Sequence, residues 1–72
     1  MSLTSGEKIK IILKRRNMTI EKLADKLNQS RQNLTQKLTR DNFSEKELCK
    51  IAEILDCKFH TEFIFNDTGE RL

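Results

Sequence analysis

Apolar residues recur every three to four positions in four separate segments of the first 56 residues, a spacing typical of helices that bury one face. We expect helices at about 6–16, 19–27, 30–39 and 44–55. The predicted inner faces consist of Ile9, Ile12 and Leu13; Ile20, Leu23, Ala24 and Leu27; Leu34 and Leu38; and Leu48, Ile51, Ala52 and Leu55. The pattern therefore predicts a small, mainly α domain over residues 1–56.

Short polar residues mark the ends of these helices. The expected N-caps are Thr4 with Glu7, Thr19, Ser30 and Ser44 with Glu47, and the expected stops are Asn17, Asn28 and Asp56. Only Asn28 and Gln29 separate the second inner face from the cap at Ser30. Because two helices joined this tightly must cross at a steep angle, the spacing predicts a helix-turn-helix.

After Cys57 the pattern changes to strict alternation, which is typical of a strand. Phe59, Thr61, Phe63 and Phe65 would share one face of a C-terminal β-strand over residues 57–66. Asn66–Gly69 reads as a turn or a frayed end, and residues 67–72 as a tail.

A lone strand is not stable in water, and we expect no second strand within the chain. Two copies would then pair antiparallel about a two-fold axis to form a homodimer. The alternative is an apolar tail that folds onto its own core.

The charge of the chain is divided between its two halves. Residues 1–40 carry a net charge of +7 and residues 41–72 carry −4, which together give the overall +3. A basic half joined to an acidic half suggests a surface that faces a polyanion. An ordinary solvated distribution of charge is the alternative.

The segment 30–39 differs from the other predicted helices because it has no acidic residue. Its expected exposed residues are Arg31, Gln32, Asn33, Thr35, Gln36, Lys37 and, just beyond, Arg40. In the major groove of DNA, arginine pairs with guanine in a bidentate manner, and glutamine or asparagine pairs with adenine. A solvated helix face is the alternative, but such faces usually mix both signs of charge. The composition of this helix favours DNA reading.

Residues 6–56 resemble the Cro/repressor (XRE-type) helix-turn-helix family. The matching stretches are Gly6–Ile9, Met18–Thr19, Leu23–Ala24, Ser30–Leu34, Leu48, Ile51–Ala52 and Leu55. The stretch Asp41–Ser44 and the residues up to Cys57 are similar to a subgroup of short regulators that end in a strand. The resemblance implies a four-helix lambda-repressor-like helix-turn-helix domain with one C-terminal β-strand.

The resemblance also implies which residues contact DNA. Base contacts would come from Arg31, Gln32 and Gln36, supported by Asn33 and Thr35. Backbone contacts would come from Thr19, Ser30, Lys37, Arg40 and Arg16. Two departures from the family pattern stand out. Ile20 replaces a DNA-contacting glutamine, and Leu38 replaces a glutamate that pairs with the arginine of the first helix. Arg16 must therefore find another partner or face phosphate.

These observations together predict a small transcriptional regulator, a repressor, that binds palindromic double-stranded DNA as a homodimer. Two recognition helices about one DNA turn (~34 Å) apart would contact two half-sites. A protein-interaction module or antitoxin-like partner that uses the C-terminal strand is the second hypothesis. An enzyme is not expected, because the single histidine and the absence of a glycine-rich loop leave no catalytic constellation.

No cofactor, metal or membrane partner is expected. Cys49, Cys57 and His60 are too few for a zinc site. Both cysteines are interpreted as small buried side chains in a reducing cytoplasm, and a disulfide or redox pair is the alternative. The longest apolar run is Ile11–Leu13, too short to span a membrane. The first residues lack the pattern of a signal peptide, so a cytoplasmic location is expected.

Overall fold

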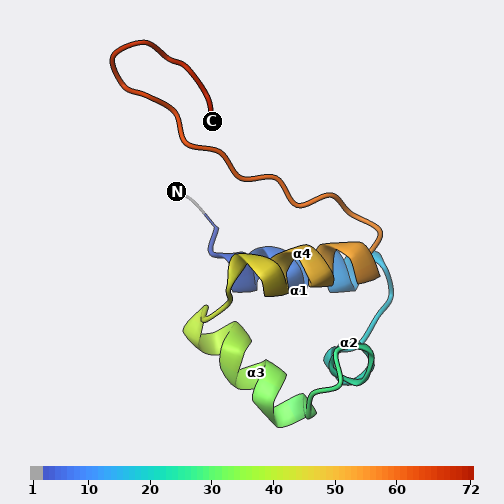
Figure 1. The fold of residues 1–72 in the computed structure, drawn as a ribbon. Coiled ribbons are helices and arrows are strands. Elements are labelled where there is room, and N and C mark those ends of the chain that lie inside the picture. Colours follow the sequence, from blue (N-terminus) through green and yellow to red (C-terminus); the bar gives the residue numbers. More distant parts are fainter. Residues whose placement is uncertain (1–2) are drawn as a thin grey trace.

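The computed structural model of the chain describes residues 3–72 and folds this part into four helices (Figure 1). They are α1 Ser5–Arg15, α2 Ile20–Lys26, α3 Arg31–Arg40 and α4 Glu45–Ile54. The predicted helices are confirmed, with bounds that agree to within a residue. Residues 1 and 2, which open the predicted domain and the segment tested for a signal peptide, lie outside the described residues.

Each helix begins at the polar residue predicted to cap it. The side-chain oxygens of Thr4, Thr19, Ser30 and Ser44 all accept a hydrogen bond from the backbone N–H three residues later. At Thr4 the reciprocal bond from its own N–H to the Glu7 carboxylate is also present, at 3.0 Å. At Ser44 the carboxylate of Glu47 lies against a lysine of α3 instead, which connects two helices.

The helices end where a residue adopts the left-handed conformation. Asn17, Asn28 and Asp56 have φ values of 53°, 57° and 57°, which confirms the three predicted stops. Asp41 ends α3 in the same way, with φ 53°, and was not predicted. Asparagine and aspartate tolerate this conformation better than most residues, so none of the four ends needs a glycine.

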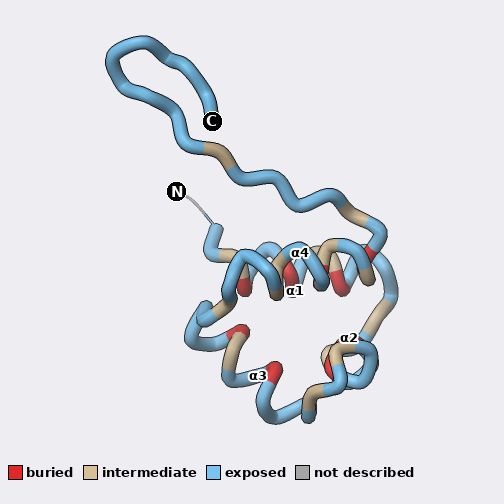
Figure 2. The backbone as a smooth tube through the Cα atoms, viewed as in Figure 1, coloured by how far each residue is buried: buried red, intermediate tan, exposed pale blue. Residues whose placement is uncertain are grey.

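The core is a single cluster in which every helix takes part. Figure 2 shows the buried positions on the inward sides of the helices. They are Ile9, Leu13, Leu23, Ala24, Leu34, Leu38, Ile51 and Leu55. All eight belong to the predicted inner faces, while Ile12, Ile20, Leu27, Leu48 and Ala52 are half-buried at the margin. A core this small leaves little stability to spare.

The first turn of α1 lies unusually close to the last turn of α3. A Cβ atom at Gly6 would stand 2.4 Å from the backbone oxygen of Leu38, a distance that real side chains do not reach. The backbone N–H of Gly6 also donates to the Asp41 carboxylate at 2.8 Å. The glycine and the aspartate together fix the C-terminal end of α3 against α1.

The predicted C-terminal strand over residues 57–66 is wrong, because the described part of the chain forms no strand there. Residues 57–62 form no strand, and the only pairing in this part of the described chain is one antiparallel bridge between Ile64 and Arg71. Phe63 and Leu72 exchange two backbone hydrogen bonds of 2.8 Å. Residues 70–72, expected to be a tail, therefore run antiparallel to residues 63–65 and supply a backbone partner within the chain, although neither segment forms a full strand.

The reason is the turn at residues 66–69, which is confirmed. Gly69 has φ +75° and its N–H donates to the Phe65 oxygen at 2.8 Å. A left-handed glycine at the end of a short connection lets two strands turn back on each other. The chain consequently folds into a hairpin, defined here as residues 63–72, at the end of an extended segment of residues 57–62.

The alternative prediction, that an apolar tail folds onto its own core, is also wrong, because the hairpin does not pack on the helices. Figure 1 shows it projecting away from the helices, and the molecule measures 44 × 23 × 23 Å. Phe63 is 82% exposed, and Phe59 and Phe65 are exposed as well. Among the helices of residues 3–72, none is long and apolar enough to cross a membrane.

We predict that Gly6→Ala destabilises the protein by about 1–3 kcal/mol, because an added methyl group would collide with the backbone of α3. Alanine favours helix over glycine by roughly 1 kcal/mol, so a purely local effect would have the opposite sign. Urea unfolding followed by circular dichroism would measure the change. Lys10→Ala, on the exposed side of α1, is the control and should change stability by less than about 0.5 kcal/mol. A neutral or stabilised Gly6→Ala would contradict the close approach.

Candidate nucleic-acid interface

The helix α3 presents one long polar face to solvent. Leu34 and Leu38 are buried against the core and fix the rotation of the helix about its axis. This rotation exposes all five residues predicted to contact bases, which are Arg31, Gln32, Asn33, Thr35 and Gln36. No acidic side chain occurs within the helix. The exposed surface of α3 is therefore made only of cationic, amide and hydroxyl groups.

Most of these side chains are not engaged elsewhere. Within residues 3–72, no hydrogen bond or ion pair holds the side chains of Arg31, Gln32 or Gln36. Asn33 is the exception, because its Nδ2 donates to Oε1 of Gln29 at 3.3 Å across the turn. The donors and acceptors that Arg31, Gln32 and Gln36 would offer to base edges thus need no internal bond to be broken first.

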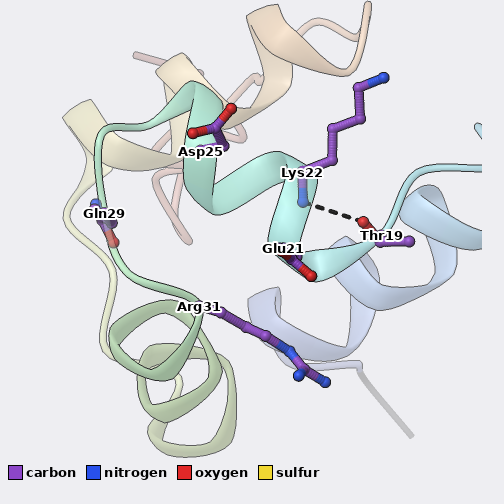
Figure 3. A pocket seen from close by; sticks show the side chains of 6 residues that line it. All are labelled: Thr19, Glu21, Lys22, Asp25, Gln29 and Arg31. Atoms are coloured by element: carbon purple, nitrogen blue, oxygen red, sulfur yellow. Dashed lines mark hydrogen bonds between the residues drawn. The ribbon is translucent and has the colours of Figure 1, made fainter.

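An open hollow of about 690 Å³ lies between α2 and the start of α3 (Figure 3). Its lining residues are Thr19, Glu21, Lys22, Asp25, Gln29 and Arg31. Sequence reasoning named Thr19 and Arg31 but missed the other four. The four-residue spacing of Glu21 and Asp25, which places both carboxylates on one face of α2, could have revealed these two of the four. The hollow combines both signs of charge and holds no histidine or cysteine.

The hydroxyl groups of Thr19 and Ser30 stand at the N-terminal ends of α2 and α3. The Thr19 oxygen accepts from the N–H of Lys22 at 3.1 Å, and the Ser30 oxygen accepts from the N–H of Asn33 at 3.0 Å. Both residues are exposed. Each hydroxyl keeps its own proton for an outside acceptor, as the predicted phosphate contacts require.

A second, smaller hollow of about 130 Å³ lies along α3. Its lining brings Gln36 together with Lys37 and Arg40, two of the predicted backbone contacts. Asn33 and Asn42 complete it, and Asn42 was not identified from the sequence. Base-contact and backbone-contact candidates thus form one continuous surface on the second half of α3.

Lys37 has a partner inside the protein. Its Nζ lies 2.5 Å from Oε2 of Glu47. The Lys37 side chain is 24% exposed and the Glu47 side chain 32% exposed. The hydrogen bond from Lys37 is the main cause that lowers the pKa of Glu47 below its ordinary value, with smaller contributions from contacts with Ser44. This ion pair ties α3 to the first turn of α4.

Arg16 also has an internal partner, although Leu38 replaces the glutamate that pairs with this arginine in the family pattern. Its Nε donates to the Leu55 oxygen at 3.1 Å, and its Nη2 donates to the Asp56 oxygen at 3.2 Å. A cation at this place satisfies free carbonyl groups at the C-terminal end of α4. Of the two possibilities, another partner or phosphate, the structure shows the first.

The two cysteines differ in their exposure. Cys49 is exposed rather than buried, which corrects one expectation, and Cys57 is half-buried; both are free thiols. In the described part of the chain, no group of three His, Cys, Asp or Glu side chains is placed to hold a metal ion. The exposed face of α3, which carries cations and no carboxylate, is suited to binding a polyanion by charge and hydrogen bonds.

Comparison with known proteins supports this interpretation. The sequence model of a family described as the Cro/C1-type HTH DNA-binding domain matches residues 8–67. The match covers all of α2, α3 and α4 and extends into the hairpin. No curated protein and no solved structure shows a significant match to the chain.

We predict that Glu47→Gln lowers the free energy of unfolding at pH 7 by about 0.5–1 kcal/mol, because the pair with Lys37 is partly exposed. The pKa of Glu47 is lowered in the folded protein, so the stabilisation exists above about pH 4.3, the ordinary glutamate value. It should disappear as the pH falls through the lowered value. Urea unfolding of both proteins from pH 7 to pH 3 would measure this convergence. Glu53→Gln, exposed on α4, is the control; an equal loss there would contradict the role of the pair.

Proposed function

Because the chain belongs to the family of Cro/C1-type helix-turn-helix DNA-binding domains, we propose that it is a transcriptional repressor that inserts α3 into the major groove of its operator. Membership of the family makes it a small regulator that binds DNA sequence-specifically. The matched family is a DNA-binding one rather than an enzymatic one, and we assign the chain no catalytic activity. The repressor role and the contacts below are our proposal.

The exposed, acid-free face of α3 is the observation that carries this function. We assign base contacts to Arg31, Gln32 and Gln36, with Asn33 and Thr35 in support. Arg31 would pair with guanine and the glutamines with adenine, since these are the bidentate contacts that their geometry allows. The freedom of the Arg31, Gln32 and Gln36 side chains from internal bonds supports this assignment.

Contacts with the DNA backbone fall to Thr19, Ser30 and Arg40, whose side chains are exposed around the same surface. Lys37 would join them only by leaving or sharing its bond with Glu47. Arg16 would contact phosphate only through the donors not used on α4. Of the cations proposed for the backbone, Arg40 thus requires the least rearrangement.

A homodimer is the second part of the proposal. One recognition helix offers few base contacts, and dimers of this kind gain specificity by binding two half-sites of a palindrome. The exposed apolar hairpin at the end of the chain is the segment available for self-association. The homodimer would form through residues 57–72, by the hairpin rather than by a strand over residues 57–66.

The exposed aromatic residues also favour a second candidate function. Phe63, Ile64 and Phe65 are large apolar side chains exposed at one end of the molecule, and exposed apolar surface of this kind marks protein-binding sites. In this alternative the chain is a protein-interaction module or an antitoxin-like partner, and the hairpin binds a different polypeptide. Both functions can belong to one chain, because they use separate surfaces.

We predict that selection from random duplex DNA yields a palindromic consensus with two half-sites about one helical turn (~10 base pairs) apart. Purified protein, repeated rounds of selection and sequencing would measure it. A consensus with a single half-site would contradict the dimer while leaving DNA reading intact. A failure to enrich any sequence would contradict the function itself.

We predict that Arg31→Ala and Gln36→Ala each weaken binding to the selected site by about 1–3 kcal/mol and relax the preference at one base pair of each half-site. Fluorescence anisotropy with labelled duplexes, each carrying one changed base pair, would measure affinity and preference together. Lys50→Ala, which removes one exposed positive charge from α4, is the control for charge alone. If Arg31→Ala lost affinity equally for every duplex, Arg31 would be a backbone contact and not a base contact.

A further inference from the structure

The hairpin carries an apolar face that its own chain leaves uncovered. Phe63 pairs with Leu72 and Phe65 with Glu70, so these four side chains share one face. Phe63 is 82%, Phe65 46% and Leu72 71% exposed. A two-stranded hairpin alone is marginally stable in water. The face therefore requires a partner surface if the hairpin is to persist.

The same molecule has a partly open apolar groove that its own residues 57–60 line along with the helices. A groove of about 340 Å³ runs between α1 and α4, at the point where residues 57–60 leave the helices. Ile12 of α1 and Leu48 and Ala52 of α4 form its walls, and all three are only half-buried. Its volume is at the lower end of the range for protein pockets that enclose apolar groups. The walls thus offer apolar surface of a size that suits a few large side chains.

We propose that this groove receives Phe63 and Phe65 of a second copy of the chain, whose own groove receives the hairpin of the first. This mutual insertion, called the exchange below, rests on the homodimer of the proposed function and specifies which surfaces form its interface. Every copy carries one hairpin and one groove, so a two-fold arrangement covers both surfaces of both copies at once.

The charges at the edges of the two surfaces are opposite. Lys8 and Lys58 border the groove, and no carboxylate lines it. The aromatic face of the hairpin is bordered by Glu70, and the turn adds Asp67. Arg71 lies on the other face, where it pairs with Glu62 at 3.1 Å. The acidic border of the hairpin therefore matches the basic rim of the groove, which favours this orientation of docking.

The course of the chain favours a second copy over closure within one chain. The extended residues 57–62 start at the groove and lead away from it, and they carry the hairpin out beyond the helices (Figure 1). The match to the family extends through residue 67 and therefore includes Phe63 and Phe65. No residue of α3 lines the groove, and the exchange leaves the polar face of α3 uncovered.

The test compares two neighbouring residues of the hairpin that face opposite ways. Phe63 and Ile64 are both exposed, but Ile64 lies on the face of Arg71. We predict that F63D raises the dissociation constant of the dimer about a hundredfold, since two phenylalanine side chains leave their seats in each dimer. The matched variant I64D should leave the constant within about threefold of the original. Sedimentation equilibrium of the full chain without DNA measures both.

Mixing two defective variants tests the exchange itself. A52E fills the groove but keeps the hairpin, whereas F63D keeps the groove. Each alone should be monomeric, and an equal mixture should form a heterodimer because one hairpin and one groove remain intact. Circular dichroism checks that A52E is folded, and I12A, which removes one wall of the groove, replaces it if A52E is not.

Three results would overturn the exchange: an original chain that stays monomeric at the highest attainable concentration, equal effects of F63D and I64D, or a mixture that remains monomeric. Anisotropy of the same proteins with the selected DNA keeps the two proposals apart. A chain that dimerises through the hairpin but selects no DNA would contradict the proposed function alone. If the original chain binds its selected DNA but F63D and I64D both dimerise as the original chain does, the exchange alone is contradicted.

Discussion

The close contact between Gly6 and Leu38 is the constraint on which the geometry of this domain depends. The backbone of α1 meets the backbone of α3 without a side chain between them, and Asp41 holds the contact with a bond to the Gly6 N–H. Leu34 and Leu38 then set the rotation of α3. The exposed polar face of α3 is therefore oriented by contacts on the opposite side of the same helix, namely the backbone approach at Gly6 and the buried side chains of Leu34 and Leu38. Such support would matter for the proposed insertion of α3 into the major groove, since a small tilt would displace every side chain at the far end of the helix.

Two further contacts join the C-terminal parts of the domain to this frame. Lys37 of α3 forms an ion pair with Glu47 of α4. Arg16, at the end of α1, donates hydrogen bonds to carbonyl oxygens at the C-terminal end of α4. Both residues are cations that a basic surface would lead one to assign to phosphate. The structure shows that part of the positive charge of residues 1–40 is used to hold the helices together, so net charge overstates the number of cations available to DNA.

Much of the fold could be predicted from the sequence because it is determined by local rules. The periods of Ile9 and Leu13 or of Ile51 and Leu55 identify the inner faces, and polar caps such as Ser30 set the helix starts. The position of Arg31, Gln32 and Gln36 on the surface followed from the same periodicity. The pairing of Lys37 with Glu47 could not be predicted in this way, because it depends on how two helices cross. The close approach of α1 to α3 at Gly6 could not be predicted either, because glycine in a sequence indicates only a residue that disfavours helix.

The hairpin shows the limit of pattern reasoning most clearly. Alternation of Phe59, Thr61, Phe63 and Phe65 predicted one strand, but alternation only shows which side chains share a face and not whether the backbone finds a partner. Glu70, Arg71 and Leu72 have no strand pattern of their own and pair because Gly69 returns the chain to them. A turn residue, rather than the hydrophobic pattern, decided the structure of this segment.

The extended segment of residues 57–62 makes the distance between the helical domain and the hairpin adjustable. Its backbone takes part in no ladder, so a residue gained or lost after Cys57, which packs against the core, would shift no register. Evolution could thus lengthen or shorten this tether at little cost in folding. In the proposed homodimer, such a change would alter the distance between the two copies of α3 without altering α3 itself.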